Sequence, residues 1–268
     1  MDNNANQNTR NSTEARGTTN VSWEGVMPTV TFSTHCHAGD REALYANLNK
    51  LVQSHEHAFN EIQVIHQRCE IDTKNMGAGI SYIQVSESDY DQYLKLFGIP
   101  EEDARADELT HGPGSPHYWK NHCVNHLAGA EHAKSDYIVF SDSDCVIIRN
   151  EAPGWIDMAI KYMEENPDCF AVSPSDGAPG RQWIMSQQLF IVNRKRFMAM
   201  DFNCWDGCPI DGGPMIEYYF MLEGRISMYM LKHGFYRWVL PDNWRYFHCW
   251  EQHKEPKHLY DMAMEKLK

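Results

Sequence analysis

The stretch Asp136-Tyr-Ile-Val-Phe-Ser-Asp142-Ser-Asp144 decides the fold, because an apolar run is followed at once by two carboxylates. Residues 137–141 predict a buried strand. Open α/β sheets bind ligands at the carboxyl ends of their strands, which is where Asp142 and Asp144 are expected. Two like charges held there are stable with a cation beside them, and oxygen ligands favour Mg²⁺ or Mn²⁺. The triplet therefore predicts a divalent cation site, with an acidic turn that caps the next segment as the alternative.

Strand and helix signals surround this stretch. Residues 29–34 and 62–66 have the composition of strands, and residues 41–58 between them have the apolar period of a helix with Asp40 at its N-cap. This strand–helix–strand succession predicts a βαβ unit with parallel strands. We also expect strands at 80–85, 170–173, 188–192 and 238–240, and an extended segment at 145–148. Helices are expected at 117–134, 155–164 and 214–222. Residues 86–116 should form a loop with at most one short helix near 90–96, and a second loop should follow residue 240 and continue through Trp250. The alternation predicts an α/β protein with a mostly parallel sheet flanked by helices.

Composition narrows the class of protein. The chain has 268 residues, of which 42% are hydrophobic and 23% charged, as in a soluble globular protein. Its net charge of −13 disfavours double-stranded nucleic acid and anionic membranes as partners. We expect residues 1–26, which are polar and aperiodic, to be disordered, and residues 27–268 to form a single domain.

Targeting signals and cysteines point to one compartment. The sequence contains neither a long apolar run of membrane-spanning length nor the apolar core of a signal peptide. Its eight cysteines form no CxxC pair, whereas zinc sites usually have such tight pairs. Several of them, such as Cys145, stand in apolar runs, so we expect reduced thiols in the core. We therefore expect a cytoplasmic protein without a membrane span.

The segment 119–144 resembles the helix-plus-strand signature of GT-A fold glycosyltransferases of the family 2 type. In that signature a basic residue and an asparagine on a helix precede an Ala/Gly-rich end and an apolar strand that closes in Asp-x-Asp. Here Lys120 or Asn121, Asn125 and Ala128-Gly129 stand at the comparable positions. The resemblance extends over about residues 28–195, and the strand at 30–34 with the helix that follows resembles the first nucleotide-binding unit of the family.

The chain also departs from the family pattern. Many family 2 members carry an acidic pair after the second strand, where this chain has His66-Gln67-Arg68. The first strand ends in Thr34-His35-Cys36-His37 instead of a turn with proline. The nucleotide therefore stays open between UDP and GDP.

The resemblance implies a GT-A fold with a nucleotide-sugar-binding half at 27–150 and an acceptor-binding half at 151–268. It implies that Asp144 binds Mn²⁺ or Mg²⁺ directly, while Asp142 contacts ribose or the metal through water. His248, ahead of His253 and His258, is the expected third metal ligand. The expected contacts of the nucleotide-sugar donor are Thr34, His35, Asp40, Arg41, Lys120, Asn125, Asp142, Ser143 and Asp144.

A catalytic base is expected where the resemblance places one in inverting enzymes, just before a helix in a glycine-rich turn. Asp211 stands there, with Asp206 and Glu217 as reserves, and a helix N-cap is the alternative role of Asp211. The implied function is metal-dependent, inverting transfer of a sugar from a nucleotide-diphosphate sugar to a hydroxyl of a glycan or another acceptor.

Three other functions compete with sugar transfer. A metal-dependent hydrolase would use His35-Cys36-His37, which is an HxH pattern. A non-catalytic sugar-binding module would explain the aromatic and acidic residues, but it would not need a nucleotide-type βαβ unit. A nucleotidyltransferase usually has a glycine-rich basic loop after its first strand, and this chain has none there.

Overall fold

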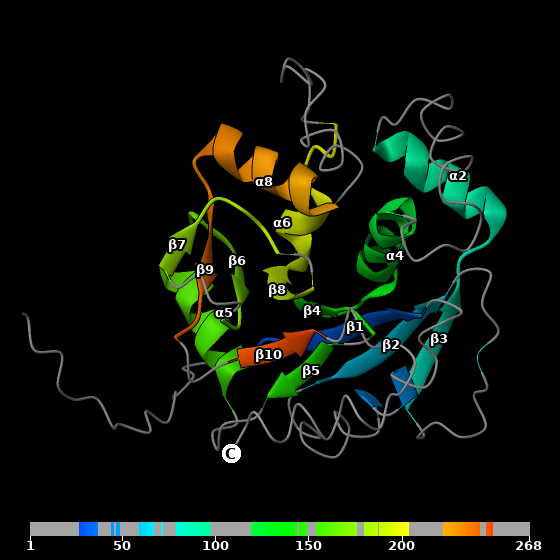
Figure 1. Cartoon of the computed structure of the whole chain (residues 1–268), viewed down its shortest axis with the longest axis horizontal. Helices are drawn as coiled ribbons and strands as arrows, with labels where there is room; N and C mark the ends of the chain where they lie inside the picture. Colours follow the sequence, from blue (N-terminus) through cyan, green and yellow to red (C-terminus); the bar gives the residue numbers. More distant parts are fainter. Residues whose placement is uncertain are drawn as a thin grey trace, which may run out of the picture.

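The structure is a computed structural model that describes residues 27–36, 44–45, 47–48, 59–66, 71, 79–97, 119–143, 145–148, 154–175, 180–186, 188–203, 222–241 and 245–248. An eight-stranded sheet with the order β3-β2-β1-β4-β8-β6-β9-β7 forms the centre of this part of the chain (Figure 1). Its strands come from both of the halves expected from the sequence.

The first four strands of this order form its parallel part. β1 (Val30–Cys36) pairs in parallel with β2 (Glu61–His66) and with β4 (Tyr137–Ser141), and β2 pairs in parallel with β3 (Ile80–Gln84). The predicted parallel βαβ pair is therefore confirmed, and residues 44–45 and 47–48 between its strands are helical. Every residue of β1 and β4 is buried, in keeping with their β-branched and aromatic composition.

The other strands make the sheet mixed. β8 (Leu189–Asn193) runs antiparallel to β4 and to β6 (Cys169–Ser173). β9 (Tyr236–Val239) is parallel to β6, and β7 (Gly180–Gln182) is antiparallel to β9. A separate two-stranded sheet joins β5 (Cys145–Ile148) to β10 (Arg245–His248) in antiparallel register.

Helices cover the sheet (Figure 1), and buried apolar side chains form a core on each of its faces. Along β4, Ile138 and Phe140 pack into a core with α2 (Glu87–Leu96), α4 (Trp119–His132) and α8 (Leu222–His233). Tyr137 and Val139 pack into a second core with α5 (Trp155–Glu165). This alternation is the period of two expected of a strand buried on both sides, and it fixes which residues beyond β4 face α4.

The approach of α4 to the sheet depends on Gly129. A Cβ atom at this position would meet the Oγ of Ser33 on β1 at a distance that atoms do not tolerate. Because no side chain intervenes, Gln63 of β2 reaches the helix and donates from its Nε2 to the carbonyl of Gly129 at 2.6 Å and to Ser33 Oγ at 3.0 Å. The Ala/Gly-rich end of the predicted motif therefore serves to seat the helix on the sheet.

The sequence prediction was wrong or incomplete at four elements. The segment before Trp250 was expected to be a loop, but residues 245–248 form β10. The strand β7, the short helix α6 (Arg194–Met198) and the helix α8 were not predicted. The sequence of α8 gives a weak helix signal because Arg225 interrupts its apolar face. This arginine is nevertheless fully buried, and it donates from Nη1 to the carbonyls of Phe97 and Phe202, both at 2.9 Å.

Several other expectations fall on residues that the structure does not describe. These are the disorder of residues 1–26, most of the helix at 41–58, and the helix at 214–222 apart from Leu222, where α8 begins. Among the described residues, no helix has both the length and the apolar character needed to cross a membrane.

Candidate functional site

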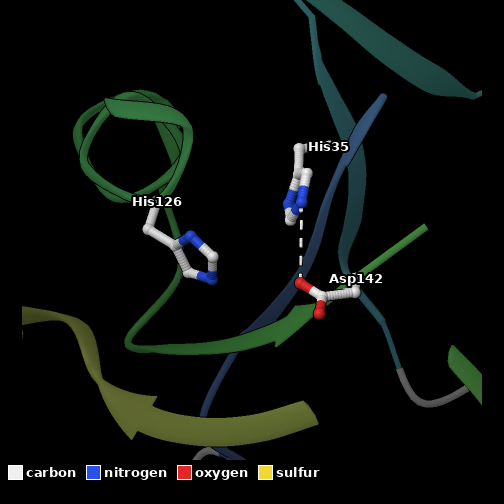
Figure 2. A group of neighbouring side chains, drawn as sticks. All are labelled: His35, His126 and Asp142. Carbon is white, nitrogen blue, oxygen red and sulfur yellow. Dashed lines mark ion pairs between the residues drawn. The ribbon is translucent and has the colours of Figure 1, made fainter. Parts of the chain in front are cut away.

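The acidic triplet begins at the carboxyl edge of the parallel strands. Thr34 of β1 lies opposite Ser141 of β4, so the next residues along each strand, His35 and Asp142, are neighbours. His35 Nε2 lies 3.5 Å from Asp142 Oδ1, and their side chains are only 4% and 8% exposed (Figure 2). The period of two places Asp142 on the same face as Phe140, which is the face that α4 covers.

The backbone around Asp142 is held by hydrogen bonds from several elements. The Asp142 N–H donates to the carbonyl of Gln188 at 2.8 Å, and the Cys145 N–H donates to the Asp142 carbonyl at 3.1 Å. The Asn47 Nδ2 donates to the carbonyl of Ser143 at 2.6 Å. Asp142 and Ser143 are only 7% and 2% exposed. These first two residues of the triplet therefore form a fixed, buried turn, unlike an acidic turn on the surface.

A third polar side chain reaches the same place from α4. His126 is 2% exposed, and its ring lies 5.5 Å from the ring of His35, measured between centroids. Its other neighbours are the rings of Phe140 at 4.8 Å and Phe190 at 5.9 Å. The potential ligand atoms of His35, His126 and Asp142 all lie within 4.8 Å of one another (Figure 2). The structure thus gathers two imidazoles and a carboxylate from β1, α4 and the end of β4.

The sequence analysis did not single out His126, although a signal for it exists. His126 stands three residues after Cys123 and four before Ala130, which places it on the apolar face of the helix. A histidine on a face that packs against a sheet is bound to be buried, and the strand edge below it carries polar residues.

The strand register brings His248 close to the triplet along the backbone. β10 pairs with β5 so that His248 lies opposite Cys145, which is the residue after Asp144. Asp144 itself lies outside the described residues. The two expected metal-binding segments, which are about 100 residues apart in the chain, are therefore adjacent in the fold.

The remaining predicted site residues divide into two groups. Thr34 is buried in β1, Lys120 belongs to the first turn of α4, and Asn125 is buried in the middle of that helix. Among the described residues, no hydrogen-bond partner exists for either Oδ1 or Nδ2 of Asn125. The predictions that lie outside the described residues are those for Asp40, Arg41, Asp144, Asp211, the reserves Asp206 and Glu217, and the histidines 37, 253 and 258.

Comparison with known proteins gives one family match. Residues 119–222 match the model of glycosyl transferase family 2, a segment that begins with α4 and includes β4 and the acidic triplet. No protein of curated function matches the sequence significantly.

Two solved structures resemble the chain in fold. Core-mannan synthase A from Aspergillus fumigatus, in an Mn/GDP form, has a TM-score of 0.49 and 10% identity, over 85% of this chain and 77% of the other. A mannosyltransferase from Pyrobaculum calidifontis, in complex with GDP-Man and Mn²⁺, has a TM-score of 0.42 and 14% identity, over 84% of this chain and 59% of the other. Likeness at this level identifies neither a donor nor a cation for this chain.

The family match falls on the segment whose residues carry the resemblance stated from the sequence. It covers less than half of the chain, but it includes the helix, the strand and the carboxylates on which that resemblance was based. The match confirms the predicted resemblance to family 2 glycosyltransferases over this segment.

Proposed function

We propose that this protein moves a sugar from a UDP- or GDP-linked donor to a hydroxyl of a glycan or another acceptor, with the help of Mn²⁺ or Mg²⁺. The observation that carries this proposal is the burial of Asp142 at the carboxyl edge of β4, inside the segment that matches the family. Ligands of open α/β sheets bind at this edge. The donor would therefore lie across the ends of β1 and β4.

The residues around the triplet fit a hard divalent cation. A carboxylate that is 7% exposed is costly unless it is paired or binds a metal, and Mn²⁺ and Mg²⁺ prefer carboxylate oxygens. Asp142 and Asp144 would hold the ion, and His248 would complete the set because its strand runs beside the residue after Asp144. When bound, such a cation neutralises charge on the diphosphate leaving group.

The described residues support binding of the donor in a fixed orientation. The hydrogen bonds from Asn47 to Ser143 and from Asp142 to Gln188 hold the turn before any ligand arrives, so little reorganisation is needed on binding. The buried amide of Asn125 offers both a donor and an acceptor. Thr34, His35, Lys120, Asp40 and Arg41 would complete the contacts to the nucleotide.

The transfer step requires a proton acceptor on the side of the sugar acceptor. We assign this role to Asp211 in an inverting reaction. The acceptor oxygen forms a bond to the anomeric carbon while the bond from that carbon to the diphosphate oxygen breaks, and the hydroxyl proton passes to Asp211. Residues 151–268 would supply the acceptor site.

A calorimetric titration tests the donor site. UDP, GDP, CDP and their sugars are titrated into the full chain, with Mn²⁺ and with EDTA. We expect one nucleotide family to bind only with the cation, and Asp142→Asn and Asp144→Asn to lower its affinity at least about tenfold. Asp157→Asn is the matched control, because Asp157 lies in the first turn of α5, which packs on β6. Binding of the cation without binding of any nucleotide would refute the proposal.

A further inference from the structure

The cluster of His35, His126 and Asp142 has a composition that the donor-site cation does not require. Two of its three potential ligands are imidazole nitrogens, whereas Mg²⁺ and Mn²⁺ sites are built mainly from oxygen. Each side chain comes from a different element, and the three point toward one another (Figure 2). All three are more than nine-tenths buried.

The distances fit coordination better than a direct ion pair. In tetrahedral zinc sites the metal lies about 2.0–2.2 Å from nitrogen and oxygen ligands, which puts the ligand atoms about 3.4 Å apart. His35 Nε2 and Asp142 Oδ1 are 3.5 Å apart, which is close to that value. An N–H···O hydrogen bond is shorter, at about 2.7–3.2 Å. The ligand atoms of the three residues all lie within 4.8 Å of one another, so a small movement of the His126 side chain would bring it to the same ion.

The surroundings also favour a preformed site. The His126 ring lies against the rings of Phe140 and Phe190, and its helix is seated on β1 by Gly129 one turn further along. Asp142 is held by the hydrogen bond of its backbone to Gln188. Because the ligands belong to three elements with fixed relative positions, an ion between them would meet donors that need little reorganisation.

We propose that His35, His126 and Asp142 bind one transition-metal ion of the Zn²⁺ class. This ion is separate from the cation proposed at Asp142, Asp144 and His248, and the two sites share Asp142. It would tie α4 and β1 to the end of β4 and fix the orientation of the Asp142 carboxylate. The site does not depend on the proposed function, because it needs no nucleotide to form.

Cobalt titration of the metal-stripped full chain tests the site. We expect a Co²⁺ ion with the visible absorption of tetrahedral nitrogen and oxygen coordination, displaced by Zn²⁺, in addition to any Co²⁺ at the cation site of Asp144 and His248. His126→Phe and His35→Gln should weaken Co²⁺ binding at least about 100-fold, since each removes a ligand. His126→Phe keeps an aromatic ring beside Phe140 and Phe190. The control is His132→Gln on the same helix, whose Nδ1 lies 2.9 Å from the carbonyl of Ala128 and which should leave Co²⁺ binding unchanged.

X-ray absorption fine structure of the Zn²⁺-loaded wild-type chain tests the site without any variant. Two imidazole ligands and no sulfur in the first coordination shell are expected. Thiolate charge-transfer bands, fewer than two imidazoles, or Co²⁺ binding that survives His126→Phe and is lost in Asp144→Asn would overturn the proposal. Absence of Co²⁺ binding would also overturn it and leave His35 and Asp142 as an ion pair. Failure of nucleotide binding in the calorimetric titration would not affect it.

Discussion

The Nε2 of Gln63 donates a 2.6 Å hydrogen bond to the carbonyl of Gly129, which ties β2, the second strand of the βαβ unit, to the helix that precedes β4. The same nitrogen lies 3.0 Å from Ser33 Oγ. This contact holds α4 at the distance from β1 at which His126 and His35 approach each other. The close packing of Gly129 therefore determines the geometry of the cluster of His35, His126 and Asp142, one helical turn away.

Gly129→Ala should therefore destabilise the protein. The new methyl group would overlap with Ser33 Oγ, and moving the helix would cost about 1–3 kcal/mol in the free energy of unfolding. Urea unfolding of Gly129→Ala, Ser33→Ala and the double variant measures this effect. Because Ser33→Ala removes the overlapping oxygen, the double variant should lose less than the sum of the single losses. Strict additivity would show that the overlap is not the cause.

Asn125→Leu should separate stability from binding. No described residue bonds the buried amide, so replacing it by an apolar group of similar size should leave the stability of the ligand-free chain unchanged or raise it by up to about 1 kcal/mol. If Asn125 contacts the donor, the same change should weaken nucleotide binding roughly tenfold, which is about 1.4 kcal/mol.

A matched control exists at the end of α5. The Asn166 Nδ2 donates to the carbonyl of Tyr162 at 2.9 Å, so Asn166→Leu should lower stability by about 1 kcal/mol without affecting nucleotide binding. Thermal unfolding and calorimetry on both variants suffice. A large loss of stability in Asn125→Leu would show that the amide has a structural role.

Arg225→Met should be among the more destabilising single changes. The guanidinium is fully buried and its Nη1 donates to the carbonyls of Phe97 and Phe202, so its loss would leave two buried acceptors unpaired and cost roughly 2–4 kcal/mol. Lys161→Met on α5 is the control, because Lys161 is half exposed and its ion pair with Glu165 contributes little. Chemical denaturation of both variants gives the comparison, and equal midpoints would contradict the role of Arg225.

Asp136→Asn should make stability less sensitive to acid. Hydrogen bonds from the Thr29 N–H and hydroxyl to the Asp136 carboxylate lower its pKa below the usual value of 3.8. A lowered folded-state pKa stabilises the fold above the unfolded pKa, and that contribution is lost as the pH falls through the folded pKa. Urea midpoints measured from pH 6 down to pH 3 should fall more steeply for the wild type than for Asp136→Asn. Parallel curves would rule out this contribution.

Local patterns predicted the elements that build the site. β4 has the predicted bounds because an apolar run of this composition is buried on both faces, and α4 begins and ends within two residues of the prediction because its apolar face is regular. Pairings between segments that are distant in the chain produce no comparable local pattern in the sequence. The contact of β10 with β5 joins residues about 100 positions apart, and the burial of Arg225 depends on carbonyls in two other segments.

The candidate site was predictable only in part for the same reason. Asp142 was predicted because it directly follows a predicted strand, and His35, which follows the strand expected at 29–34, was predicted from the family resemblance. The parallel register places the two side by side. The participation of His126 depends on how closely and in which direction α4 lies on the sheet. That geometry follows from the contact of Gly129 with Ser33, which a sequence pattern does not contain.

Because side chains alternate between the two faces of β4, the number of residues between Gly129 and Asp142 decides whether the Asp142 carboxylate faces α4. Phe140 and Asp142 face α4, while Val139 faces the opposite core. Removing or adding one residue in the short connection before β4 would exchange the two faces of the strand, so that serines would stand where the carboxylates are needed. Selection should therefore act on the length of the connection at 133–136 as strictly as on the acidic residues.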